Sequence, residues 1–234
     1  MKILIPSGAA GAIIGRGGDA IAHLQKESGA KVKMSKANDF YPGTTERVCL
    51  IVGTVSAIER VHDYIMERIA EKPDANSKPI EITHADGTKQ LVERGKQVKV
   101  LVPNSTAGMI IGKGGAYIKE LKDRTGSFIQ ISQKGKEVNL PERCITIAGE
   151  VEQNRQTVHL TLLKIAEDPQ SASCPNISYS DVHGTYSNLK MTFNQPQSVA
   201  IVFQPPSKFL LTWIFDAVHS KATLHLHLYL ILTD

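Results

Sequence analysis

Three features are scarce in this sequence of 234 residues: aromatic side chains, cysteines and excess charge. Phe, Trp and Tyr make up 6% of the chain, which argues against a nucleic acid held mainly by rows of stacked rings. The three cysteines, Cys49, Cys144 and Cys174, are odd in number and far apart, so they suit neither a disulfide framework nor a paired-cysteine zinc site. The net charge of only +4 excludes a wholly basic polyanion binder.

Enzymatic and targeting signatures are missing as well. The sequence has no HExxH motif, nucleophile elbow or kinase signature, and its one close histidine pair, His225 and His227, lies in an unusual C-terminal tail. The opening apolar stretch is broken by Pro6 and a glycine cluster, unlike a secretory signal. Polar residues between Asp216 and Lys221 interrupt the apolar tail before it reaches the length of about 18–20 residues that a membrane span needs. We predict a protein that is not an enzyme and has no cofactor, metal or membrane partner.

The organisation of the chain follows from an internal repeat. The stretch Ile3 to Gly18, ILIPSGAAGAIIGRGG, recurs as VLVPNSTAGMIIGKGG from Val100 to Gly115. The match continues beyond these stretches and, after a slip of one residue, includes the pairs Glu46-Arg47 and Glu142-Arg143. Self-similarity of this kind indicates two copies of one domain.

The repeat sets the domain boundaries. We predict one copy at residues 1–72 and the other at 97–169. Residues 73–96 are rich in Pro, Asp, Lys and Gly and contain one short β-like run at 79–83. We expect a linker that behaves as flexible coil. Residues 170–234 lack the repeat, and we expect an irregular, poorly ordered tail.

Periodicity predicts the same element order in each copy: strand, helix, glycine loop, helix, strand, variable loop, strand and helix. In the first copy the opening strand ends at Pro6, and short helices cover residues 9–14 and 19–28. Strands follow at 30–36 and 47–52, and a longer helix ends before Pro73. This order predicts an α+β fold.

A glycine loop separates the two short helices of each copy. Glycines allow close backbone approach and positive φ, and the helix that follows offers free N–H groups and a partial positive charge. An anionic phosphodiester suits such a turn, and a basic residue within the loop adds one cation. We predict nucleic-acid binding by the two loops, Gly15, Arg16, Gly17 and Gly18 in the first and Gly112, Lys113, Gly114 and Gly115 in the second.

Three other interpretations of the loops were weighed. The first loop satisfies the dinucleotide fingerprint GxGxxG/A, but Tyr117 breaks that pattern in the second, and the loops follow helices rather than strands. A phosphate-binding Walker A loop fails because only three residues separate Gly108 from Gly112. A plain turn without a ligand stays open, although it poorly explains a basic residue in both loops.

The residues around the two glycine loops resemble the core motif of a known domain. The segments Ile14–Ile21, IGRGGDAI, and Ile111–Ile118, IGKGGAYI, resemble the IGxxGxxI core of the KH domain. The resemblance implies two type I KH domains, each with the order β-α-α-β-β-α and a three-stranded antiparallel sheet packed on three helices. More narrowly, Asp39–Leu50, Val102–Gly108 and Glu167–Tyr179 resemble the Nova/Pasilla family of splicing regulators. That family carries a third KH domain, and no part of this sequence resembles one.

A KH domain holds about four nucleotides of single-stranded nucleic acid, with the glycine loop against the backbone and the bases over an apolar groove. We interpret Ile21, Leu24, Ile118 and Leu121 as core rather than contact residues. The strand after the second helix can offer backbone N–H and C=O groups in an adenine-like pattern. The predicted groove and base-edge residues are Ile14, Val32, Lys33, Met34 and Arg47, with Ile111, Ile129, Gln130, Ile131 and Arg143 in the second copy.

The two arginines of this set have two interpretations. Arg47 and Arg143 match the position where related KH domains read cytosine through a side chain. The alternative is a surface arginine that pairs with the glutamate before it, Glu46 or Glu142.

The resemblance implies binding of YCAY-like elements in pre-mRNA, regulation of alternative splicing, other splicing factors as partners, and a nuclear location with cytoplasm in addition. The residues alone indicate only a single-stranded nucleic acid. Two alternatives therefore stay open. One is a single-stranded DNA or poly-pyrimidine binder acting in transcription or in mRNA stability or translation, and the other is a scaffold of degenerate KH domains that binds no nucleic acid.

Overall fold

The computed structural model describes residues 1–73, 79–83, 87–133, 140–171 and 179. All of them belong to one compact unit of the chain, Met1–Gln195. The expected irregular tail, apart from its first residues and Tyr179, and the histidine pair within it lie outside the described residues. In the part of the chain that is described, no helix combines the length and the apolar character that crossing a membrane requires.

Each repeat folds in the predicted order. The first forms β1 (Lys2–Pro6), α1 (Ser7–Ile14), η1 (Arg16–Gly18), α2 (Asp19–Ser28), β2 (Lys31–Met34), β3 (Glu46–Val52) and α3 (Val55–Glu71). The second forms β6 (Gln97–Pro103), α4 (Asn104–Ile111), η3 (Lys113–Gly115), α5 (Ala116–Thr125), β7 (Phe128–Ile131), β8 (Glu142–Ala148) and α6 (Val151–Glu167). The predicted α+β class with two β-α-α-β-β-α units is confirmed.

Local sequence explains where these elements end. Gly29 has φ 72° and terminates α2 in the left-handed region, and Gly126 does the same for α5. The Thr54 side chain accepts a hydrogen bond from the Ala57 N–H and so begins α3. One face of α3 is apolar and buried, and its members are Ala57, Ile58, Val61, Ile65 and Ile69.

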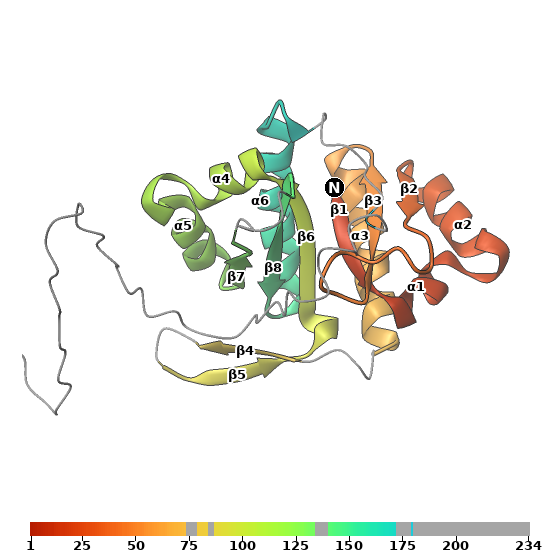
Figure 1. Cartoon of the computed structure of the whole chain (residues 1–234), viewed down its shortest axis with the longest axis horizontal. Coiled ribbons are helices and arrows are strands. Elements are labelled where there is room, and N and C mark those ends of the chain that lie inside the picture. Colours follow the sequence, from red (N-terminus) through yellow and green to blue (C-terminus); the bar gives the residue numbers. More distant parts are fainter. Residues whose placement is uncertain (74–78, 84–86, 134–139, 172–178, 180–234) are drawn as a thin grey trace, which may run out of the picture. The chain divides into compact units, whose positions relative to one another are not determined.

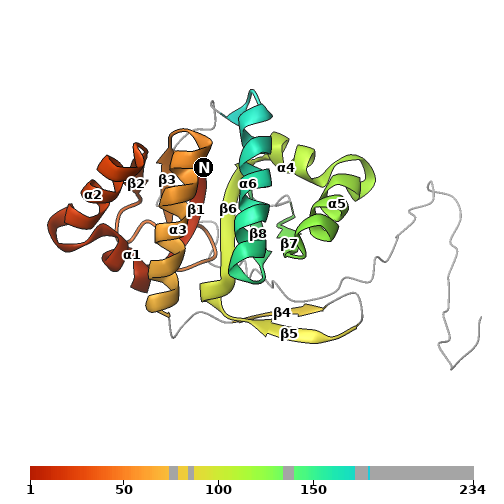
Figure 2. The ribbon, with the colours of Figure 1, turned by 180° about the vertical axis from the view of Figure 1, so that it is seen from behind.

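The two repeats share one six-stranded sheet of order β2-β3-β1-β6-β8-β7. The strands β1 and β6 join the repeats as an antiparallel pair, with Lys2 opposite Leu101 and Ile3 opposite Val100. Opposite views show α3 and α6 side by side on one face of the sheet, and the two helix-loop-helix units at its opposite ends (Figures 1 and 2). The domains that the repeat predicts are therefore joined through their first strands.

Side-chain alternation along the strands divides the buried residues between two faces. Ile3 and Ile5 of β1 point into the core beneath the helices, whereas Leu4 joins a second cluster on the other face. Val100 and Leu101 of β6 divide in the same way. We call the face without helices the outer face of the sheet.

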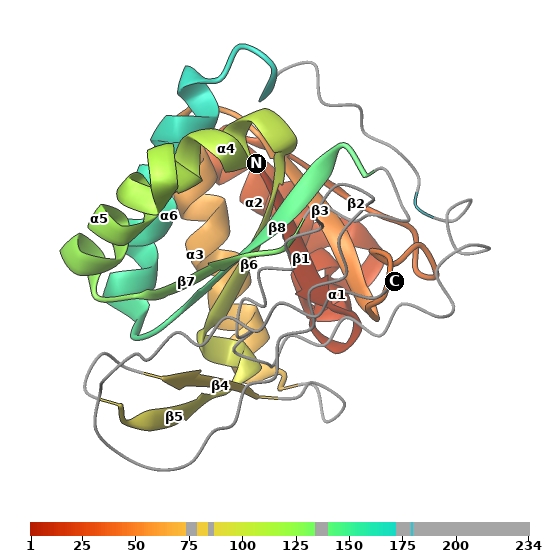
Figure 3. The ribbon, with the colours of Figure 1, turned by 60° about the vertical axis from the view of Figure 1, so that its left-hand side comes forward.

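The segment between the repeats differs from the flexible coil that we expected. Within it, β4 (Ile80–Thr83) and β5 (Lys89–Val92) pair as an antiparallel hairpin, which lies beyond the end of the six-stranded sheet (Figure 3). Ile82 and Val92 are buried with Ala148 of β8. Burial of these side chains offsets the entropy lost in ordering the segment. The short turn η2 (Arg94–Lys96) then leads into β6.

Candidate nucleic-acid interface

The first glycine of each loop allows a close approach between loop and helix. Gly15 has φ 77°, and a Cβ atom placed on it would lie 2.6 Å from the Cβ of Ala20. Gly112 has φ 72°, and its Cβ would lie 2.7 Å from the Cβ of Tyr117. Both the backbone angle and the lack of space therefore require glycine here. These two residues shape the loops.

The middle of each loop faces open space. A Cβ on Gly17 or Gly114 would meet no atom within 4 Å, and Arg16 and Lys113 are exposed beside them. The helices that follow, α2 and α5, begin without a side-chain cap, so their first N–H groups have no side-chain acceptor. The N–H groups of Asp19 and Ala116, the first residues of these helices, donate to the carbonyls of Arg16 and Lys113. The helix dipole and the one basic side chain of each loop remain to attract a phosphate.

Apolar side chains continue from each loop along the surface where the sequence predicts the groove. Ile14 and Ile111, which directly precede the loops, are half-buried, whereas their neighbours Ile13 and Ile110 are fully buried in the core. On the strand side, the predicted residues differ in exposure. Met34 and Ile131 are half-buried, while Val32 and Ile129 are buried core residues.

The groove strands β2 and β7 are the edges of the six-stranded sheet. The N–H of Ser35 donates to the carbonyl of Val48 across the ladder, at 2.8 Å. Because backbone groups alternate in direction along a strand, the N–H and C=O of Met34 point away from β3. In the second repeat the Ser132 N–H donates to the Cys144 carbonyl at 2.8 Å. The N–H and C=O of Ile131 therefore point away from β8, as those of Met34 point away from β3.

The same alternation limits two other predicted residues. The backbone groups of Lys33 and Gln130 face the ladder, and their exposed side chains stand on the outer face of the sheet. By the same alternation, the backbone groups of Val32 and Met34, and those of Ile129 and Ile131, point away from the neighbouring strand. The base-edge prediction therefore depends on these four residues.

The two grooves differ at one backbone donor. In the first, the Val32 N–H donates to Oε1 of Gln25 on α2, at 2.9 Å. The second repeat has Lys122 in the place of Gln25, and an ammonium group cannot accept a hydrogen bond. Lys122 lies over the Phe128 ring, 5.8 Å from its centroid. The Ile129 N–H therefore lacks the side-chain acceptor that its twin has.

The two arginines are fixed by equivalent contacts. Nε of Arg47 donates to the carbonyl of Ser35 at 3.0 Å, and Nη2 donates to the same oxygen. Nε of Arg143 donates to the carbonyl of Ser132 at 2.5 Å. Burial lowers the pKa of both guanidinium groups, which nevertheless stay charged. Each arginine is held at the end of a groove strand.

The alternative pairing of each arginine with its neighbouring glutamate is wrong. Adjacent residues on a strand point to opposite faces, and Glu46 stands on the outer face while Arg47 does not. Glu46 binds Arg94 Nε at 2.6 Å and Lys99 Nζ at 3.1 Å, and Glu142 binds Lys2 Nζ at 2.9 Å.

Our sequence reasoning missed the anchoring serines. Ser35 and Ser132 each accept from an arginine through the backbone carbonyl, and each accepts through Oγ from the residue after that arginine, Val48 or Cys144. The signal was available, because serine occupies this position in both copies of the repeat.

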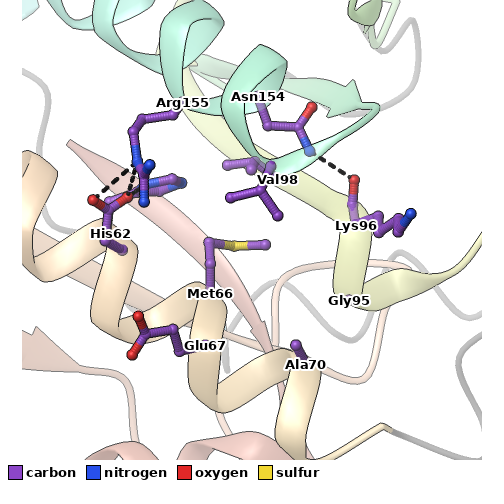
Figure 4. Close-up of a pocket in the computed structure, with 11 residues that line it drawn as sticks. His62, Met66, Glu67, Ala70, Gly95, Lys96, Val98, Asn154 and Arg155 are labelled. Atoms are coloured by element: carbon purple, nitrogen blue, oxygen red, sulfur yellow. Dashed lines mark hydrogen bonds and ion pairs between the residues drawn. The ribbon is translucent and has the colours of Figure 1, made fainter.

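A separate hollow lies between α3 and α6. It has a volume of about 160 Å³, and Met66 and Val98 line it. Arg155 bonds Asp63 across its rim, and Asn154 Nδ2 donates to the Lys96 carbonyl at 2.9 Å (Figure 4). None of the predicted binding residues lines this hollow. Within the described residues, no group of three or more His, Cys, Asp or Glu side chains is arranged to hold a metal ion.

Both repeats of the sequence match a known protein family. Residues 1–67 and 97–161 match the KH domain family. The chain belongs to this family, with one domain in each repeat, which we call KH1 and KH2.

Three individual proteins with sequences similar to this chain describe the relationship in more detail. The chain is 58% identical to RNA-binding protein Pasilla of Drosophila melanogaster over 192 residues, 82% of this chain and 24% of the relative. It is 51% identical to human RNA-binding protein Nova-2 over 194 residues, 82% of this chain and 39% of the relative. Human far upstream element-binding protein 1 is 32% identical over 161 residues, 68% of this chain and 23% of the relative. The resemblance to the Nova/Pasilla family is thus confirmed. The chain spans less than half the length of each of these three relatives.

Proposed function

We propose that this chain binds single-stranded RNA through two equivalent grooves, one in KH1 and one in KH2. The observation that carries the proposal is the open middle of each glycine loop, where a basic side chain and the start of a helix follow a half-buried isoleucine. The loop binds the phosphodiester backbone and the groove holds the bases. Two of the relatives carry the name RNA-binding protein, in agreement with this proposal.

Sequence specificity is assigned to the strand side of each groove. The outward N–H and C=O of Met34 and Ile131 match the acceptor and donor edge of an adenine. Arg47 and Arg143, held against serine carbonyls, present a guanidinium beside that position and read a cytosine. These assignments favour the YCAY-like elements that the Nova/Pasilla resemblance implies.

The biological role proposed is regulation of alternative splicing of pre-mRNA in the nucleus, with the cytoplasm as a second location and other splicing factors as partners. The support is the similarity to the Nova/Pasilla family over most of the chain.

Tight binding requires both domains. A groove for about four nucleotides gives modest affinity, and the small net charge supplies little non-specific attraction. The two groove strands are opposite edges of one sheet, and five steps of about 4.8 Å place them about 24 Å apart. Two elements on one RNA therefore bind cooperatively when the spacer spans that separation.

Charge reversal in a single loop tests the assignment. Arg16→Asp combined with Gly17→Asp places two carboxylates where KH1 binds phosphate, and Asp tolerates the φ of 62° at Gly17. The matched variant in KH2 is Lys113→Asp with Gly114→Asp. We expect each variant to lose one site on an RNA with two CA-containing elements, with affinity falling at least about tenfold. Fluorescence anisotropy measures the affinity, and circular dichroism confirms the fold.

Two outcomes contradict the proposal. If a variant with both loops reversed binds RNA as wild type does, the loops are not the site. If DNA of the same sequence competes with RNA on equal terms, the ligand is single-stranded nucleic acid in general rather than RNA.

A further inference from the structure

The outer face of the sheet carries a buried apolar patch that both domains build. Leu4 and Val48 come from KH1, and Leu101 and Cys144 come from KH2. Each is at most 4% exposed, although none of the helices in the described part of the chain lies on this face. Two tyrosines complete the cluster, Tyr41 from the variable loop of KH1 and Tyr179 from beyond the second repeat, each 2% exposed. We call these six residues the outer patch.

Tyr179 is attached to both domains. Its ring meets the Tyr41 ring edge-on, with centroids 5.5 Å apart and planes at 66°. Its backbone N–H donates to Oδ1 of Asp39 in KH1 at 3.0 Å. Its hydroxyl donates to Oε1 of Glu142 in KH2. A residue outside the repeats thus connects them.

The Glu142 carboxylate extends this connection. Its other oxygen, Oε2, binds Nζ of Lys2 on β1, at 2.9 Å, and the side chains of Glu142 and Lys2 are 1% and 8% exposed. A buried ion pair is stable only if its remaining hydrogen-bonding capacity is satisfied. The Tyr179 hydroxyl therefore supports the ion pair that crosses from KH2 to KH1.

A second glutamate is satisfied in an equivalent way. Lys99 and Glu46 repeat the pair Lys2 and Glu142 with the domains exchanged, at 3.1 Å. Glu46 receives its additional donor from Arg94, at 2.6 Å, in the segment between the repeats. Each glutamate thus binds the lysine of the other domain and one donor from outside the repeats. Tyr179 and Arg94 hold corresponding places.

We propose that Tyr179 is a positioning residue that fixes the orientation of KH1 relative to KH2 and thereby sets the spacing between the two RNA elements that the chain binds together. This inference rests on the proposed RNA binding. The two grooves lie at opposite edges of the sheet, so their separation is constant only while the pair β1–β6 stays rigid. A rigid pair has a sharp spacer optimum, and a loosened pair has a broad one.

The first test needs no RNA. Burial raises the pKa of the Cys144 thiol to about 12, and Tyr179 belongs to the cluster that covers it. In Tyr179→Ser we expect a thiol reagent to modify Cys144 at least about tenfold faster than in wild type. Cys49, buried in the helix-side core, is the internal control, and peptide mass spectrometry separates the cysteines. Unchanged Cys144 labelling overturns the proposal that Tyr179 closes this face.

The second test measures spacing. Full-length wild type and Tyr179→Ser are titrated with RNAs whose two elements are separated by spacers of about 4 to about 25 nucleotides. We expect wild type to show an optimum, and the variant to lose at least about tenfold in affinity there. Affinity for an RNA with one element stays within about twofold, because the described contacts of Tyr179 are Asp39, Tyr41 and Glu142, none of which is a predicted groove residue.

Two further proteins keep the outcomes distinct. Tyr179→Phe retains the ring but removes the hydroxyl. We expect Cys144 to stay protected in this variant while the spacer profile broadens. This variant also provides the test if Tyr179→Ser does not fold. Tyr64→Phe removes a hydroxyl on α3, remote from the outer patch, and leaves both readouts unchanged. An unchanged spacer profile in the Tyr179 variants overturns the inference. The absence of RNA binding by wild type overturns the proposed function instead. In that case the labelling of Cys144 still shows whether Tyr179 closes the outer patch.

Discussion

KH1 and KH2 share backbone geometry more closely than side chains. The φ values of the three loop glycines agree within 7° between the copies, and both arginines bond a serine carbonyl. Side chains differ at many positions, among them Ala20 and Gln25 of KH1, which correspond to Tyr117 and Lys122 of KH2. The proposed phosphate binding therefore depends on a backbone form that the glycines fix and that both domains share, whereas residues 20 and 25 of KH1 and their equivalents in KH2 differ.

The junction between the copies is also only partly symmetric. Glu46 is bonded to two cations, Arg94 and Lys99, whereas the donors described for Glu142 are Lys2 and the neutral hydroxyl of Tyr179. The symmetric part comes from the repeat, and the asymmetric part comes from segments outside it.

The largest effect is expected from Glu46→Ala. This change leaves Arg94 and Lys99 buried without their carboxylate, and a lost partner of a buried ion pair costs about 3–5 kcal/mol of unfolding free energy. Glu142→Ala removes the carboxylate from Lys2 and is expected to cost less, because the described cations are two for Glu46 and one for Glu142. Urea unfolding monitored by circular dichroism measures both. Equal losses contradict the asymmetry.

An intermediate effect is expected from acid. Burial by itself raises the pKa of the Glu46 carboxyl, but the charges and hydrogen bonds of Arg94 and Lys99 hold it below its ordinary value of 4.5. A depressed pKa stabilises the fold fully above the unfolded-state pKa, and this contribution is lost as the pH falls through the folded-state value.

The unfolding free energy of wild type should therefore fall more steeply below about pH 4.5 than that of Glu46→Gln, which has no carboxyl at this position. Urea titrations at a series of pH values give the two slopes. Because both proteins retain Asp63, whose pKa is also lowered, its contribution cancels. Parallel pH profiles contradict the prediction.

The smallest effect is expected from exchanging the groove residues. Gln25→Lys removes the acceptor of the Val32 N–H, and Lys122→Gln supplies one for the Ile129 N–H. Each exchange makes one groove resemble the other at a single neutral hydrogen bond of about 1 kcal/mol, so affinities for single-element RNAs should change by about fivefold or less. Titration of variants whose other loop is reversed isolates each groove. Identical base preferences before and after both exchanges show that this position does not distinguish the copies.

Much of the fold could be predicted because its signals are local. Pro6 ends β1, Gly29 ends α2, and the apolar period of α3 defines its buried face. The β-like run at 79–83 indicated the first strand of the hairpin β4–β5, but its pairing with β5 could not be predicted, because the hairpin packs against Phe128 and Ala148, which lie far along the chain.

The candidate site was predicted unevenly for the same reason. The glycine loops are contiguous in sequence, so their geometry is encoded where the residues stand. The direction of Lys33 and Gln130 depends instead on strand register, because one step along a strand reverses the face.

The sequence alone determined the two copies, their element order, their basic glycine loops and a modest net charge that favours two-site binding. Only the tertiary structure decided that β1 and β6 join them into one sheet, that the glutamates bind across the junction, and that Tyr179 lies over both domains. The physical reason is distance along the chain. Turns, caps and periodicity act between near neighbours, whereas a buried ion pair between Lys2 and Glu142 forms only once both strands are in register.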